Sequence, residues 1–376
     1  MAELNFYKQS MLQTIKETYP KYRQENILKE LQKEGLIYVE NPLITVDDSV
    51  DITDVPEEEQ LVYSVQNSDT ILKKVEDFEI KSSYSYSAIF SMSEYPAELL
   101  EQLKERNVIK NYSLNNDALI TDINNISPSY CEVDSNTLIL KFSRLLNGFL
   151  PIEGDNKRQI KYPIIAVLYQ DLNILEIRFE KVRGFLKNND EYFYHKQITL
   201  VKSWVEEYLA TETEALNLSP VIEYITQNED KEVYVSAQAM NLKSKKKAIL
   251  DTGENDEDVL PLLGELKALI KENQEKFDEN PDIKDLLENF ILETEQSSDL
   301  PWISLTWKNE SKSKAIKIKF QFNYLKQDYS LLQYYGNKTE MERMNYVTRY
   351  LIENKTKCDE DFETEEFGEN DQSQTG

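Results

Sequence analysis

The chain has 376 residues and a formal net charge of −26, with 69 acidic side chains against 43 lysines and arginines. This length allows two or three domains and a substantial buried core. Aromatic residues make up 11% of the sequence, which argues against general disorder because disordered chains are poor in aromatics. The acidity disfavours diffuse attraction to nucleic acid or anionic lipid.

The sequence shows no sign of a membrane or of an oxidising compartment. No apolar run approaches the roughly 18 residues that span a bilayer. Residues 1–8 lack the pattern of a signal peptide. Two cysteines, Cys131 and Cys358, are too few and too far apart for a disulfide framework. We therefore expect a cytoplasmic protein without membrane contact, and the Lys-, Asn- and Ile-rich composition favours a bacterial or phage source.

The first part of the chain predicts helices. Apolar residues recur at helical spacing over residues 6–19 and 22–31. Gly35 then supplies a C-terminal cap, and residues 36–39 are typical of a short strand. This order is compatible with a winged-helix element over residues 21–43.

An N-terminal mixed helical domain is expected over residues 1–125. Residues 44–60 are polar and acidic, as in a loop, and Pro96 opens a further helix. The Asn-rich stretch 111–129 is typical of a connection between domains. A second, α+β domain then covers residues 130–357.

Strands dominate the middle of the chain. Residues 138–142 form one predicted strand, and residues 163–169 and 174–182 form a hairpin. A helix is expected near residues 198–209, followed by a strand at 232–237. The pattern predicts a central antiparallel sheet.

Two further hairpins are predicted toward the C-terminus. Residues 260–295 carry two amphipathic helices around Asn280 and Pro281, with Leu269, Ile283 and Leu286 among the residues expected to face inward. Residues 302–307 and 316–323 then alternate between apolar and polar, as in a half-buried β-hairpin.

The chain is expected to end in a helix and a disordered tail. The last helix opens with a capping box, Thr339 and Glu342. Residues 358–376 contain 8 acidic side chains and no basic ones, which predicts a disordered acidic tail.

Charge is segregated along the chain. Residues 40–101 and 251–299 each carry a net charge of −12, whereas residues 301–357 carry +6. Such segregation favours function through charged surfaces, including an acidic surface for a basic partner. Plain solubility explains the acidic stretches equally.

Most catalytic signatures are absent. A single histidine, His195, excludes histidine-containing triads and His-Glu-x-x-His zinc sites. The spacing of Gly148 and Gly154, followed by Asp155, does not make a phosphate-binding loop. Catalysis by carboxylate side chains is not excluded by these absences. Asp171, Glu176 and Arg178 could serve a divergent Mg²⁺-dependent nuclease, although alternation along the strand favours a solvated sheet face.

Basic clusters supply candidates for binding a polyanion. They are Lys243, Lys245, Lys246 and Lys247 after one strand, and Lys317, Lys319 and Gln321 on the wet face of the last hairpin, with Trp and Tyr residues nearby. A lysine-rich strand can also serve only to prevent aggregation.

The leading interpretation is a non-catalytic binding or scaffold subunit of an intracellular bacterial or phage assembly, with a protein partner and with nucleic acid as a further ligand. It needs no cofactor and no metal. Two alternatives remain: the Mg²⁺-dependent nuclease, and a nucleic-acid-binding regulator that uses the winged-helix element.

Overall fold

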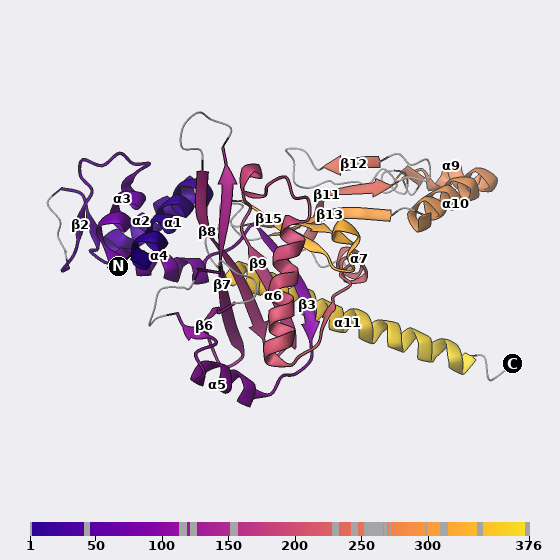
Figure 1. Cartoon of the computed structure of the whole chain (residues 1–376). Helices are drawn as coiled ribbons and strands as arrows, with labels where there is room; N and C mark the ends of the chain where they lie inside the picture. The colour runs from indigo at the N-terminus through magenta and orange to yellow at the C-terminus, as the bar shows by residue number, and fades with distance from the viewer. Residues whose placement is uncertain are drawn as a thin grey trace. The chain divides into compact units, whose positions relative to one another are not determined.

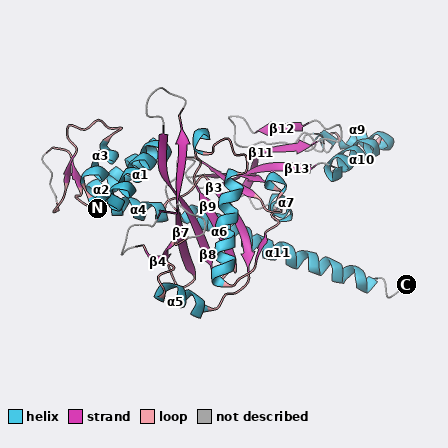
Figure 2. Cartoon of the chain, in the orientation of Figure 1, coloured by secondary structure: helices cyan, strands magenta, loops and turns pink. Residues whose placement is uncertain are grey.

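The computed structural model describes residues 2–40, 46–112, 119–120, 126–150, 157–227, 233–241, 247–251, 266, 269–270, 272–297, 299–308, 315–336 and 341–372. Contacts divide the chain into two compact units. Unit 1 comprises Met1–Leu216 and Asn337–Ile352, and unit 2 comprises Asn217–Gly336 and Glu353–Gly376. Both contain helices and strands (Figure 2), so the α+β class is confirmed. The boundaries between these units do not fall at residues 125–130, where the sequence predicts the domain boundary. The expected domain organisation stays a prediction.

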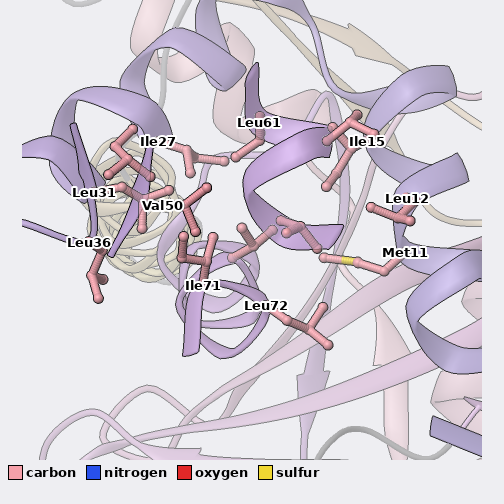
Figure 3. Close-up of a cluster of buried hydrophobic side chains, with 14 of the residues drawn as sticks. Met11, Leu12, Ile15, Ile27, Leu31, Leu36, Val50, Leu61, Ile71 and Leu72 are labelled. Atoms are coloured by element: carbon pink, nitrogen blue, oxygen red, sulfur yellow. The ribbon is translucent and has the colours of Figure 1, made fainter. Parts of the chain in front are cut away.

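Unit 1 begins with four helices: α1 (Ala2–Thr18), α2 (Lys21–Lys33), α3 (Gln60–Asn67) and α4 (Asp69–Lys81). Their apolar stripes meet in one cluster, in which Met11, Ile15, Ile27, Leu61 and Ile71 are buried. Figure 3 shows these side chains converging from all four helices. Periodicity predicted the first two helices correctly. Helices α3 and α4 were not predicted from the sequence.

Two short strands follow α2. Gly35 adopts a φ of 72°, the left-handed conformation that glycine tolerates at a helix end, so the predicted cap is confirmed. Strand β1 (Ile37–Tyr38) pairs in parallel with β2 (Val50–Asp51). A wing is an antiparallel hairpin. The pairing therefore gives no support to the winged-helix element expected over residues 21–43, which stays a prediction.

The strands of unit 1 lie in the order β3-β9-β8-β7-β6-β4, with β10 beside β3 and β5 beside β7. They are β3 (Tyr86–Met92), β4 (Lys110–Asn111), β5 (Leu119–Ile120), β6 (Ser129–Glu132), β7 (Thr137–Phe149), β8 (Lys157–Tyr169), β9 (Ile174–Phe179) and β10 (Thr213–Ala215). The predicted antiparallel hairpin is β8 and β9. Short parallel pairs, β4 with β6 and β5 with β7, make the sheet mixed.

Helices cover both faces of this sheet. On one face lies α6 (Phe193–Leu209), where Trp204 meets Phe142 edge-on with ring centroids 5.4 Å apart (Figure 1). On the other face, α1 is held by Thr14, whose Oγ1 bonds to the backbone of Lys161 at 2.8 Å. The first turns of α11 (Glu342–Gln372) also pack there, where Thr348 contacts β9. Strand β9 is consequently buried along its whole length.

Two smaller elements complete the description of unit 1. Helix α5 (Ala97–Glu105) begins directly after Pro96, as predicted. A turn of 3-10 helix, η1 (Gly184–Leu186), packs against the end of β7. A Cβ added at Gly148 would come within 2.8 Å of the carbonyl oxygen of Phe185. The glycine at position 148 therefore allows η1 to pack closely against the end of β7.

Unit 2 contains an antiparallel arrangement in the order β12-β11-β13-β14-β15. Its elements are α7 (Ser219–Gln227), β11 (Val233–Asn241), β12 (Lys247–Asp251), β13 (Asp299–Trp307), β14 (Ile316–Gln321), η3 (Tyr324–Lys326) and β15 (Leu331–Tyr335). The hairpin predicted from strict alternation is β13 and β14. Ile316, Ile318 and Phe320 are buried, and the residues between them are half-buried.

The helical hairpin of unit 2 is confirmed only in part. Helices α9 (Gln274–Asp278) and α10 (Pro281–Ser297) lie where it was expected, and Ile270 and Ile291 form a small buried cluster. However, Leu269, Ile283 and Leu286 are 49%, 52% and 70% exposed, so their inward placement was wrong. Burial among the described residues of this hairpin is centred on Ile270 and Ile291, against which Leu266, Phe277 and Leu287 pack.

The last helix is longer than predicted. Thr339 lies outside the described residues, so the capping box stays a prediction. Helix α11 continues to Gln372, through most of the stretch for which the sequence predicts a disordered tail. None of the described helices combines the length and the apolar character that crossing a membrane requires.

Candidate polyanion-binding surface

The carboxylates singled out for a nuclease lie on β9 and on the turn before it. Glu176 and Arg178 are both fully buried, because α11 covers that face of the strand. Arg178 Nη2 donates to Glu176 Oε2 at 2.5 Å and to Asn345 Oδ1 at 2.8 Å. Thr348 Oγ1 donates to the same Glu176 oxygen at 2.7 Å. The solvated sheet face expected from the alternation is therefore wrong.

Asp171 lies apart from that network. It forms an ion pair with Arg349 at 2.7 Å, with both side chains about a third exposed. The structure thus brings Glu176 and Arg178 together but gives no described contact between them and Asp171. Across the part of the chain that the structure describes, no cluster of three His, Cys, Asp or Glu side chains has the geometry of a metal site.

A second buried network joins the N-terminal helices to the sheet. Glu79 Oε2 on α4 accepts from Lys161 at 2.7 Å and lies 2.9 Å from Lys141 Nζ. Tyr19 OH donates to the other oxygen of Glu79 at 2.9 Å. Burial, reinforced by the Glu79 carboxylate, raises the pKa of Tyr19. Every ionisable group in this set is buried, so we assign the network to stability.

The basic candidates lie in unit 2, and the register of its strands decides which of them share a face. Lys317 stands between Thr306 and Tyr335, and Lys319 between Ser304 and Gln333. Gln321 stands opposite Trp302 and Leu331. Residues directly opposite each other point to the same side of a sheet. We call this side the lysine face; its side chains with exposed surface are Tyr234, Trp302, Lys317, Lys319, Gln321, Gln333 and Tyr335.

Cations and aromatic rings are interleaved on the lysine face. Lys319 Nζ lies 3.9 Å from the centroid of the Trp302 ring, and Nζ of Lys308, the residue that follows β13, lies 5.3 Å from that of Tyr234. The attraction between a cation and the face of an aromatic ring holds the two side chains together. Partial burial raises the pKa of Tyr335. The face thus combines lysine cations with aromatic rings, a combination that is also found in proteins that hold single-stranded nucleic acid.

The other basic candidates are not placed on this surface. Lys243, Lys245 and Lys246 lie outside the described residues, and Lys247 is the first residue of β12, with no described side chain. Sequence reasoning named the lysines and Gln321 but did not assign Trp302, Tyr234 and Gln333 to their face. Alternation within each strand could have shown this only if the register between strands were known.

Comparison with protein-family models found no match, and neither curated proteins nor solved structures gave one. The function of the chain is therefore inferred from its own surfaces.

Proposed function

We propose that the protein is a non-catalytic binding subunit of a cytoplasmic bacterial or phage assembly, and that the lysine face of unit 2 holds single-stranded nucleic acid. The observation that carries the proposal is the pairing of Lys319 with Trp302 beside Lys317 on one half-exposed face. Bases stack on aromatic side chains without regard to sequence, while lysines contact phosphates. A local surface of this kind suits a chain whose overall charge is acidic, because it restricts nucleic acid to one place.

Tryptophan fluorescence provides a direct test. Trp204 and Trp307 are buried, so Trp302 is the one of the three tryptophans with appreciable exposure. We expect an unlabelled oligothymidine to quench the fluorescence of the full chain, and Trp302→Phe to remove that quenching. Replacing Trp302 by alanine should weaken binding by about 1–3 kcal/mol, the contribution of one stacked base.

Charge reversal separates phosphate binding from general electrostatics. We expect Lys317→Glu with Lys319→Glu to lower affinity and to reduce the slope of the salt dependence by about 0.7 for each phosphate that is no longer neutralised. Lys276→Glu, an exposed lysine on α9, makes the same kind of charge change away from the lysine face and should leave binding nearly unchanged. Equal weakening by the two charge-reversal variants, or no quenching of wild type at about 50 mM salt and 100 µM protein, would refute the proposal.

A second contact, with a basic protein partner, is supported by the helical hairpin. Among the residues of α10 whose side chains are described, Ile283 and Leu286 are exposed and apolar, and the exposed Asp282 and Asp285 flank them. Apolar anchors with a charged rim are typical of protein interfaces. We expect a stoichiometric partner rich in Lys and Arg to co-purify from the native host at physiological salt, and Leu286→Asp to release it. A partner retained equally by Leu286→Asp would contradict docking at α10.

The nuclease alternative receives no support from the arrangement of its residues. Glu176 and Arg178 form an ion pair buried inside unit 1, and Asp171 is paired elsewhere. The regulator alternative rests on residues 21–43, where the described strand β1 pairs in parallel with β2.

A further inference from the structure

A groove of about 1010 Å³ runs along α6 in unit 1. Its walls come from Ile126, residues 144–147 of β7, residues 186–190 from the end of η1 onward, and one side of α6 as far as Tyr208. This volume is at the upper end of the range for small-molecule sites. The groove is distinct from the lysine face, and nothing in the proposed function uses it.

Arg144 is an unusual residue among those that line this groove. It follows Phe142 by two residues on β7, so its side chain lies on the face that α6 covers, beside the Trp204 contact. Its Nε is closed off from solvent and has no hydrogen-bond partner among the described residues. Burial lowers the pKa of Arg144, and no acidic group among the described residues offsets that effect. A half-buried guanidinium without a carboxylate beside it is unfavourable unless an anion joins it.

Gln197 provides a second unsatisfied group in the same wall. Its side chain is only 5% exposed, and its Nε2 donates to the Phe193 carbonyl oxygen at 3.2 Å. Its Oε1 is buried without a hydrogen-bond partner in the described part of the chain. The groove therefore offers a cation for an anion, and an acceptor for an N–H or O–H group.

Aromatic rings define the rest of the groove. Trp204 and Tyr208 stack with centroids 4.7 Å apart and planes 12° apart, and Tyr208 is half-buried. Tyr192 and His195 form a second, edge-on pair with centroids 6.4 Å apart. Of the two acids in the walls, Asp190 is paired with Lys196 at 2.7 Å, and Glu207 is exposed near the end of α6. These walls favour a flat ligand with its negative group at Arg144.

We propose that the α6 groove binds a small planar molecule that carries one anionic group, a carboxylate or a phosphate, with Arg144 as its counter-charge. Gln197 Oε1 accepts a hydrogen bond from the ligand, and Tyr208 provides a ring surface. Arg144 is assigned to binding because no described residue makes a hydrogen bond to its Nε.

The test uses the full chain and two probes, 4-aminobenzoate and adenosine 5′-monophosphate, followed by calorimetry. We expect at least one to bind with a Kd below about 1 mM, and its uncharged counterpart, methyl 4-aminobenzoate or adenosine, to bind much more weakly. The preferred probe identifies the anionic group. Arg144→Met should weaken the binding about 10- to 100-fold, as expected for loss of a charge-assisted hydrogen bond. Arg106→Met, an exposed arginine after α5, is the matched control.

Thermal unfolding without ligand separates a binding role from a structural one. An arginine that holds the fold together destabilises it when replaced, whereas removal of an uncompensated cation should leave the unfolding temperature unchanged or raise it. A clear fall in that temperature for Arg144→Met would overturn the proposal. So would the failure of both probes to bind wild type, or equal binding of charged and uncharged counterparts.

Discussion

Replacing Glu79 by glutamine is expected to lower the free energy of unfolding by about 3–5 kcal/mol, the range observed when one partner of a buried ion pair is removed. Glu79 is fully buried and lies within 2.9 Å of both Lys141 and Lys161, which are equally inaccessible. Glutamine keeps the shape and can still accept from Tyr19, so the effect isolates the charge. Urea denaturation followed by circular dichroism measures it.

A surface ion pair between the end of α2 and α4 is the control. Glu34 lies 2.8 Å from Lys74, and both side chains are more than a third exposed. Glu34→Gln should therefore change the free energy of unfolding by less than about 1 kcal/mol. If Glu79→Gln is no more damaging than Glu34→Gln, the buried network does not hold the helices on the sheet.

Arg178→Met is expected to destabilise the protein by a similar amount, about 3–5 kcal/mol, because it leaves the Glu176 carboxylate buried without its cation. Both side chains are completely inaccessible, and their atoms lie 2.5 Å apart. Removing both charges at once, with Glu176→Met and Arg178→Met, should restore much of the stability, since no isolated charge then remains. The four proteins form a double-mutant cycle that yields the coupling energy.

Arg349→Met gives the matched comparison for this cycle. Its partner, Asp171, is on the turn before β9, and the pair is partly exposed. A destabilisation below about 1 kcal/mol is expected. A double variant no more stable than Arg178→Met alone would show that Glu176 and Arg178 do not act as a pair.

The outcome for β9 shows how far the sequence could predict this fold. Alternation of Glu176 and Arg178 with apolar residues correctly placed a strand, because the period of a strand is visible locally. The same alternation predicted the wrong solvent exposure for Glu176 and Arg178, because Asn345 and Thr348, which lie far along the chain, cover that face of the strand. A covering element so distant in sequence leaves no local signal. Helix α4 was missed for a related reason: Glu76 and Glu79, which look like solvated residues, are buried in it.

The candidate surfaces were predictable to different extents. The lysine face followed from strict alternation in β14, since one strand contains both lysines and Gln321. Its aromatic members come from β11, β13 and β15, and only the pairing register assigns them to it. The groove beside α6 could not be predicted at all, because its walls combine residues 144–147 with residues 186–208.

The interleaved order of the two units bears on how the protein is made. Asn345 and Thr348, which close the face of unit 1 over Glu176 and Arg178, are translated only after all of residues 217–336. At ordinary rates of synthesis, that interval lasts on the order of ten seconds. During that interval, α11 does not yet cover the sheet face of unit 1 that carries Glu176 and Arg178, while the ribosome synthesises residues 217–336. The last turns of unit 1 are thus a late step in biosynthesis, and a chain truncated before residue 341 would lack them.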